Sequence, residues 1–199
     1  MNASDFASLH RKLQGELLTD NLVRSLYATD ASEYQEQPLA VAFPETDRDV
    51  QELIRFAQSH HIGLIPRTAG TSLAGQVVGN GIVIDFGRCM NRVLSLDVEK
   101  RRVRVQPGVV RNELNKYLMP YGLFFAPETS TANWAMIGGM VGNNSCGSNS
   151  IAYGTTRDHL HSARGFLADS SEVTFGPCTT DQINAICKQP AASLENRLY

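Results

Sequence analysis

The chain is organised around the stretch Arg67-Thr68-Ala69-Gly70-Thr71-Ser72-Leu73-Ala74-Gly75-Gln76. An apolar, β-like run precedes it at residues 62–66 and another follows at 82–86, so the stretch is predicted to be a loop of small residues between two strands. Glycine lets a backbone approach a ligand closely. The amides of such a loop, together with hydroxyl groups and a guanidinium group, are suited to hold phosphate oxygens. The alternative is a loop that merely turns the chain.

Two well-known phosphate-binding motifs do not fit this stretch. Gly70 and Gly75 have the spacing of a P-loop, but Gln76-Val77 stand where lysine and then serine or threonine are required. The Rossmann fingerprint GxGxxG is missing as well, and a strand follows where that motif opens a helix. A ligand is therefore expected to be held by the amides of a loop between strands.

Composition and charge narrow the possible partners. The 199 residues can form one sizeable core or two small lobes, and a formal net charge of −2 disfavours a nucleic-acid partner. No apolar run approaches the roughly 20 residues of a transmembrane segment, and the first residues lack the regions of a signal peptide. No two cysteines form a CxxC pair, so no metal or iron–sulfur site is predicted here, and reduced thiols in the cytoplasm are expected. Two disulfides in a secreted protein are the alternative.

The order of elements predicts an α+β fold. Phe6, Leu9, Leu13 and Leu17 follow a helical period, so one helix or two short ones are expected in residues 5–26, packed on the main domain. Residues 27–34 read as an ordered connector. A βαβ pattern begins at residue 38. It contains a strand at 39–43 and a helix that Thr46 caps and that ends at His60-His61, which we interpret as cap residues. Further strands are expected at 82–86, 93–98, 102–106, 123–126 and 160–166, with a second helix over 110–118.

Two lobes account for this pattern. We expect a helical extension and connector at 1–37, a two-lobed domain at 38–177 and the start of a linker at 178–199. The first lobe, near 38–98, is βαβ, and the second, near 99–177, is mixed α/β. The basic cluster at residues 100–104 is interpreted as an exposed hairpin turn and strand face.

A second stretch rich in small and amide side chains follows the second helix. It comprises Pro127-Glu128-Thr129-Ser130-Thr131-Ala132, Ile137-Gly138-Gly139-Met140-Val141-Gly142-Asn143-Asn144-Ser145-Cys146-Gly147-Ser148 and Tyr153-Gly154-Thr155-Thr156-Arg157-Asp158. More than 30 residues with little periodicity inside a compact domain usually serve a function. Because each lobe would carry one such stretch, a ligand between the lobes is expected, and a long dinucleotide is favoured over a mononucleotide.

The order of these motifs resembles the FAD-linked oxidases, the vanillyl-alcohol-oxidase-like flavoproteins with a PCMH-type FAD-binding domain. The resemblance covers residues 27–177 and is strongest to the D-2-hydroxyacid dehydrogenase branch, which includes D-lactate dehydrogenase, glycolate oxidase and D-2-hydroxyglutarate dehydrogenase. It implies that residues 67–76 wrap the FAD pyrophosphate. It also implies that the ribityl chain and isoalloxazine are lined by Pro127, Glu128, Thr129, Ser130, Ala132, Gly138, Gly139, Asn144, Gly147, Ser148, Tyr153 and Gly154.

Some positions depart from the family pattern. Met140 stands where many relatives have asparagine, and Ser145-Cys146 where many have alanine and glycine, so hydrogen bonding near the flavin is expected to differ. We expect Cys146 to be a small packing residue, and His159 and His161 to have structural roles and not to bind metal. No histidine occurs between residues 67 and 81, where relatives with covalent flavin have one, so dissociable FAD is predicted.

The resemblance also implies a reaction. Hydride would pass from a D-2-hydroxy acid to FAD, and the electrons would then leave to an acceptor that the sequence does not identify. The family's substrate-binding cap would follow this chain, so no catalytic residue is assigned within it, and an iron–sulfur cluster is possible in a further C-terminal part. The expected location is the cytoplasm, with attachment to a membrane through the rest of the enzyme as an alternative. A UDP-sugar-enolpyruvate reductase of the cell-wall type and a non-catalytic binding module are the rival interpretations.

Overall fold

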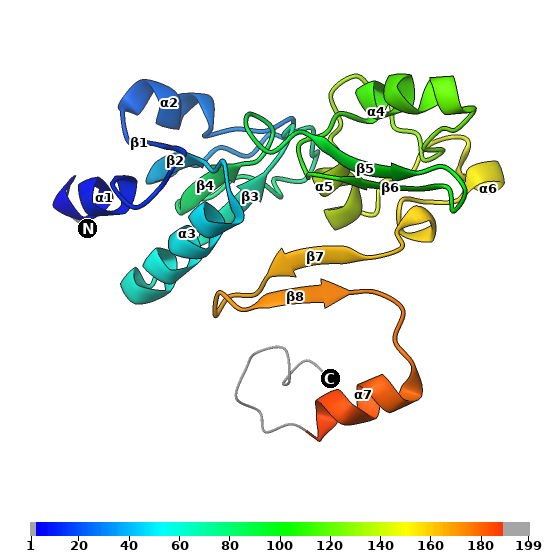
Figure 1. The fold of residues 1–199 in the computed structure, drawn as a ribbon. Helices are drawn as coiled ribbons and strands as arrows, with labels where there is room; N and C mark the ends of the chain where they lie inside the picture. The colour runs from blue at the N-terminus through cyan, green and yellow to red at the C-terminus, as the bar shows by residue number, and fades with distance from the viewer. Residues whose placement is uncertain (1–2, 189–199) are drawn as a thin grey trace.

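The computed structural model describes residues 3–188. It is a mixed α and β structure with separate sheets, which confirms the predicted α+β class (Figure 1). The outermost residues of the expected N-terminal extension, 1–2, and of the expected linker, 189–199, lie outside the described part. None of the helices within residues 3–188 combines the length and the hydrophobicity that a membrane crossing needs.

A four-stranded sheet forms the first region of the molecule. Its strands are β1 (Glu16–Leu18), β2 (Ala40–Phe43), β3 (Leu64–Arg67) and β4 (Ile82–Asp85), in the spatial order β1-β2-β4-β3. β2 and β3 are both parallel to the central β4, and β1 is antiparallel to β2. All four residues of β2 are buried, as expected for an apolar strand covered on both faces.

Helix α3 (Asp47–His60) covers this sheet and forms as the sequence predicts. Thr46 caps it: the Thr46 hydroxyl accepts a hydrogen bond from the Asp49 amide, and the Asp49 side chain reaches back to the amide of Thr46. The helix buries Leu53 completely against Ile82 and Ile84. His61 ends the helix in the left-handed conformation, with φ of 54°, which confirms the cap interpretation of the histidine pair.

The N-terminal segment differs from the expected helices. Helix α1 (Ala3–His10) and helix α2 (Asn21–Leu26) are separated by β1, so Leu17 lies in a strand. The physical reason is local: the backbone amides of Gln14 and Gly15 donate to the Asp49 carboxylate, and Gly15 lies against the Phe43 backbone, which turns the chain into the sheet. Leu9 and Leu17 are nevertheless buried in the sheet core, so the expected packing on the main domain is confirmed.

The second region contains smaller sheets and shorter helices. β5 (Val93–Asp97) and β6 (Arg102–Val105) form an antiparallel hairpin, and helix α4 (Arg111–Leu118), continued by the 3-10 helix η1 (Met119–Tyr121), packs beside it. Their shared core contains Val109, Leu114 and Leu118. Helices α5 (Ile137–Gly142) and α6 (Ser150–Tyr153) and the 3-10 helix η2 (Arg157–His159) follow.

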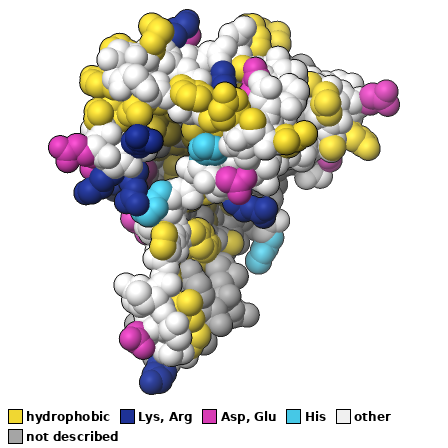
Figure 2. Space-filling view, turned by 90° about the vertical axis from the view of Figure 1, so that its right-hand side faces the viewer, with side chains coloured by type: hydrophobic (Ala, Val, Ile, Leu, Met, Phe, Trp, Pro, Cys, Tyr) yellow, Lys and Arg dark blue, Asp and Glu magenta, His cyan; other side chains and the backbone are white. Residues whose placement is uncertain are grey.

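A second hairpin and a helix complete the described chain. β7 (Ala163–Phe166) pairs only with β8 (Glu172–Phe175) in the described structure, and helix α7 (Thr180–Cys187) comes last. In the space-filling view these elements form a narrow part below the wide main body (Figure 2). An ion pair between Arg164 of β7 and Asp47 at the start of α3 joins the hairpin to the first region. A hydrogen bond of 3.2 Å from Gln51 Nε2 to the Ser170 carbonyl oxygen makes a second link.

Two expected strands require correction. Residues 123–126 form no strand and pair with none in the described structure. The side-chain amide of Asn115 takes the place of a neighbouring strand, since its Oδ1 accepts from the Phe125 amide at 2.7 Å and its Nδ2 donates to the Phe125 carbonyl at 3.2 Å. The expected strand at 160–166 is shorter and begins only at Ala163.

Candidate functional site

The site begins at the loop that joins β3 to β4. These parallel strands are direct neighbours, and residues 68–81 connect them without a helix, as the sequence predicts. Gly70 and Gly75 have φ of 65° and 70°, in the left-handed region that glycine adopts without steric cost. The Arg67 guanidinium folds beneath Gly70, and its Nη1 donates to the Thr29 carbonyl oxygen at 2.7 Å. Arg67 therefore connects the turn at Gly70 to the backbone of Thr29.

The two stretches singled out in the sequence meet in space. A Cβ atom built on Gly139 of α5 would lie 2.5 Å from the Thr68 hydroxyl oxygen, so only a hydrogen atom fits there. Gln76 Nε2 donates to Asn143 Oδ1, which follows α5, at 3.2 Å. The loop at 67–76 thus borders α5 at both of its ends, so the two glycine-rich stretches are direct neighbours.

The segment from Pro127 to Ala132 is held by the start of α4 and by the residues that follow α5. Arg111 Nε, at the start of α4, donates to the Pro127 carbonyl oxygen at 3.0 Å. A Cβ atom on Gly147 would lie 2.5 Å from the Glu128 carbonyl oxygen, and Asn149 hydrogen-bonds the Glu128 carboxylate. Residues 127–132 and 138–148 are therefore packed side by side, as one site requires.

Two hydroxyl groups at this site lack a partner. Ser72 Oγ and Thr129 Oγ1 are buried, and within residues 3–188 neither has a hydrogen-bond partner. Buried polar atoms in proteins are almost always hydrogen-bonded, and the exceptions need an explanation. One hydroxyl comes from each glycine-rich stretch, so a polar ligand that follows both stretches would satisfy both. This observation fits a ligand with phosphate and hydroxyl groups.

Several other predicted residues make contacts with neighbouring residues of the protein. Asn144 has φ of 46°, and its Oδ1 accepts from the Arg157 amide at 2.9 Å. Gly154, with φ of 74°, lies where a Cβ atom would be 2.9 Å from Asp158 Oδ2, and the ring of Tyr153 packs edge-on against Phe124. Ser130 and Ser148 are exposed, whereas Ala132 is half-buried.

The run from Thr155 to Asp158, which the sequence also indicates as part of the site, shapes it through internal hydrogen bonds. Thr156 is buried, with 1% of its surface exposed, and its hydroxyl donates to the Ser145 carbonyl at 2.7 Å. Asp158 Oδ2 accepts hydrogen bonds from both the amide and the hydroxyl of Thr155. The hydrogen bond from the amide is the main cause of the lowered pKa of Asp158. The spacing Thr-x-x-Asp over 155–158 is a signal for such a cap and was available in the sequence.

The positions that depart from the family pattern have plain structural environments. Met140 is buried in α5, with 2% exposure, so its side chain packs inward. Cys146 was expected to be a small packing residue, but this expectation is wrong because its side chain is exposed. His159 Nε2 hydrogen-bonds the Tyr153 carbonyl oxygen at 2.6 Å, and within residues 3–188 no group of three or more potential ligands could hold a metal ion.

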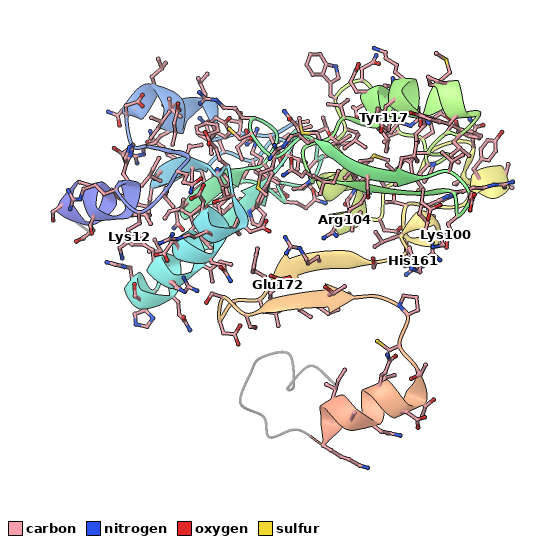
Figure 3. The ribbon with its side chains drawn as sticks, in the orientation of Figure 1. Lys12, Lys100, Arg104, Tyr117, His161 and Glu172 are labelled. Atoms are coloured by element: carbon pink, nitrogen blue, oxygen red, sulfur yellow. The ribbon has the colours of Figure 1, made fainter. Side chains whose placement is uncertain are left out.

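A large cavity lies next to this site, and residues of α5 line it. It has a volume of about 2540 Å³ and is bordered by α3, β5, β6 and β7. Arg104 and His161, both labelled in Figure 3, line it together with apolar side chains such as Val103. Of the predicted ligand-binding residues, all of which the structure describes, Gly138 alone lines this cavity.

Sequence comparison gives relatives that are much longer than this chain. D-2-hydroxyglutarate dehydrogenase of Haemophilus influenzae is 41% identical over 157 residues, which cover 77% of this chain and 15% of the relative. The Escherichia coli protein of the same name is 42% identical over 156 residues, with the same coverage. Glycolate oxidase subunit GlcD of Bacillus subtilis is 31% identical over 78% of this chain and 34% of its own length. The chain thus spans about 15% of the length of the first of these relatives.

Structural comparison supports the same fold. Alkyldihydroxyacetonephosphate synthase superimposes with a TM-score of 0.79 at 20% identity, over 92% of this chain and 37% of that protein. Xylooligosaccharide oxidase from Myceliophthora thermophila gives a TM-score of 0.73 at 24% identity, over 87% and 37%. Residues 38–176 match the family described as FAD binding domain. The chain therefore belongs to this family of PCMH-type FAD-binding domains, as its motifs predicted.

Proposed function

We propose that this chain is the FAD-binding module of a flavin-dependent oxidoreductase that oxidises a D-2-hydroxy acid of the lactate, glycolate or 2-hydroxyglutarate class. The relatives named above, and a mitochondrial D-lactate dehydrogenase of Kluyveromyces lactis that is 32% identical over 71% of this chain, support that class of substrate. Bound FAD would supply the hydride acceptor. Substrate activation is assigned to residues outside this chain, and electrons would leave to a separate acceptor.

The role proposed for this chain is to bind and orient the cofactor. Residues 67–76 would hold the pyrophosphate through loop amides and the Ser72 hydroxyl. The rest of the cofactor would be lined by Pro127, Glu128, Thr129, Ser130, Ala132, Gly138, Gly139, Asn144, Gly147, Ser148, Tyr153 and Gly154. The observation that carries this assignment is the pair of buried hydroxyl groups without partners, one in each stretch.

The test is FAD binding by single substitutions at those hydroxyls. Ser72→Ala and Thr129→Ala each remove one hydrogen-bonding group, and a loss of about 1 kcal/mol corresponds to a roughly fivefold higher Kd. Quenching of flavin fluorescence on titration of the chain measures the Kd. Ser25→Ala, in the exposed helix α2, is the matched control and should leave the Kd unchanged.

An unchanged Kd in both site variants would contradict the assignment of these loops to FAD. A folded chain with no flavin affinity at any concentration would instead favour a non-catalytic binding module. Acid precipitation of the loaded protein adds a second measurement: the flavin should remain in the supernatant, because the loop at 67–81 contains no histidine for a covalent link.

A further inference from the structure

We propose that residues 27–36, named here the N-terminal strap, hold the loop at 67–76 in the shape that binds FAD. Tyr27 and Tyr34 are its positioning residues. The strap precedes the segment that matches the family, which begins at residue 38. The proposal rests on the assignment of the 67–76 loop to FAD made above, and it adds a part of the chain that the family match does not include.

The strap is an ordered turn and not a slack connector. Its ends are joined by an isolated β-bridge between Thr29 and Gln35 and by a hydrogen bond of 2.9 Å from the Glu36 amide to the Ala28 carbonyl. Within the turn, Asp30 Oδ1 accepts from the Ser32 amide at 2.8 Å. These bonds fix the shape of the strap through its own residues, so it can act as a rigid support.

Three hydrogen bonds tie the strap directly to the base of the loop, the longest of them from Arg67 Nη1 to the Tyr27 carbonyl oxygen at 3.5 Å. The Ala31 amide donates to the Gly70 carbonyl oxygen at 3.1 Å. In the other direction, Arg67 Nη1 donates to the Thr29 carbonyl oxygen at 2.7 Å. The guanidinium also packs under Gly70. The left-handed turn at Gly70 is therefore held by the Ala31 amide of the strap and by Arg67, which the strap in turn holds in place.

Tyr34 supports the second left-handed position of the loop. A Cβ atom built on Gly75 would lie 2.7 Å from Cδ2 of Tyr34, so the tyrosine ring lies directly against this glycine. Tyr34 is nevertheless 63% exposed. Its removal would leave no buried cavity, so the substitution separates support of the loop from stability of the core.

Tyr27 anchors the strap to the sheet. Its hydroxyl donates to Asp85 Oδ2 at 2.7 Å, at the end of β4, while Asp85 Oδ1 accepts from the Gly87 amide at 2.7 Å. The Arg67 guanidinium carbon lies 5.1 Å from the centre of the Tyr27 ring, within the range of a cation–π contact. Burial, followed by the bond to Asp85, raises the pKa of Tyr27, so the hydroxyl remains a donor at physiological pH.

These contacts have a consequence for affinity. A loop with two left-handed glycines has many alternative conformations, and a ligand that binds only one of them has an apparent Kd raised by the inverse of the competent fraction. If loss of strap contacts lowers that fraction to about 10–20%, the Kd for FAD rises about five- to tenfold. Pre-organisation by the strap thus acts through the loop and needs no contact with the cofactor.

The test compares Tyr34→Ala with Tyr34→Phe in the full chain. Phenylalanine retains the ring against Gly75, so it should behave as wild type, whereas alanine should weaken FAD binding by about five- to tenfold in the fluorescence titration. Tyr121→Ala, an exposed tyrosine at the end of η1, is the control and should change nothing.

Trypsin gives a second readout that needs no FAD. Arg67 is the one arginine or lysine between Arg55 and Arg88, and trypsin can cleave after it only when its side chain leaves Thr29 and Tyr27. Cleavage after Arg67 should therefore be about fivefold faster in Tyr34→Ala and in Tyr27→Phe, because local opening sets the rate. Mass spectrometry of the fragments identifies the site.

The outcomes separate this proposal from the proposed function. Faster cleavage together with weaker FAD binding supports the strap. Wild-type cleavage in Tyr34→Ala and Tyr27→Phe overturns it, and if Ser72→Ala still weakens FAD binding, the FAD site itself stands. Faster cleavage with unchanged FAD affinity also overturns the proposal, and if Ser72→Ala has no effect either, the assignment of the loop to FAD fails as well.

Discussion

The two regions of the molecule bury their strands to very different degrees. In the first region, every residue of β2 and the first three residues of β4 are buried, and α3 seals one face of the sheet. In the second region, β6 alternates exposed and half-buried residues, and β8 buries only Val173. The strand pairs β5–β6 and β7–β8 lie on opposite sides of the cavity of about 2540 Å³.

This difference indicates which region contributes more to the stability of the fold. A two-stranded hairpin is marginal on its own, and stability requires more strands or a packed face. The first region meets that requirement with four strands and α3, so it should account for most of the free energy of unfolding. The candidate site joins the regions, since its 67–76 loop comes from the stable sheet and its α5 from the less covered region.

The largest effect should come from a cavity in the first core. Leu53→Ala removes a side chain with no exposed surface and should lower the free energy of unfolding by about 3 kcal/mol. Val103→Ala in β6 is the matched change in the second region, and because Val103 is only half-buried it should cost about 1 kcal/mol. Urea denaturation followed by circular dichroism measures both values.

An equal loss in the free energy of unfolding for the two substitutions would contradict the proposed difference between the regions. It would mean that the second region is as tightly packed in solution as the first. A smaller loss in the free energy of unfolding for Val103→Ala, together with a smaller denaturant m-value for that variant, would strengthen the difference between the regions. It would show that the second region opens before the first.

The first region was also the more predictable one from sequence. Thr46, the two acidic residues after it and the apolar stripe from Val50 to Ala57 all favour the same helix, and α3 is found as expected. Where local signals agree in this way, tertiary contacts have little to override. Leu17 shows the opposite case: its helical spacing is real, but pairing of β1 with β2 places it in a strand.

The first glycine-rich stretch forms the expected loop with left-handed glycines, whereas the conformation of the second stretch was not predicted. Gly138 and Gly139 lie in helix α5, although glycine has poor helix propensity, because close contacts with Pro107 and Thr68 leave no room for a Cβ atom. No local pattern encodes such long-range contacts. The contribution of Asn115 to residues 123–126 was likewise invisible, since one side-chain amide replaces a strand.

Within residues 3–188, each region has one polar residue that is almost fully buried, Asp49 in the first and Thr156 in the second, and these two allow a finer comparison. Asp49 in the first region accepts hydrogen bonds from the amides of Gln14, Gly15, Glu45 and Thr46. Burial alone would raise its pKa, but the four amide donors outweigh burial and lower it. Asp49→Asn should cost about 2 kcal/mol at pH 7, because the charged acceptor is lost and an amide N–H group faces other donors.

The pH dependence follows from the lowered pKa. A carboxyl whose pKa is lower in the folded state stabilises the fold above its unfolded pKa of about 3.9, and that contribution is lost as the pH falls through the folded value. The difference between wild type and Asp49→Asn should therefore be full at pH 7 and shrink below about pH 4. A difference that stays constant down to pH 3 would show that Asp49 acts through packing alone.

The smallest effect is expected at Thr156, the buried polar residue of the second region. Its hydroxyl makes one bond of 2.7 Å to the Ser145 carbonyl oxygen. Thr156→Val keeps the shape and removes that bond, so it should cost about 1 kcal/mol, half the cost at Asp49. Thr174→Val on the exposed face of β8 is the control and should lie within about 0.5 kcal/mol of wild type. Thermal unfolding measures all three proteins. A cost at Thr156 as large as that at Asp49 would mean that the segment from Ser145 to Thr156 is a second rigid core, and the site would then join two equally stable regions.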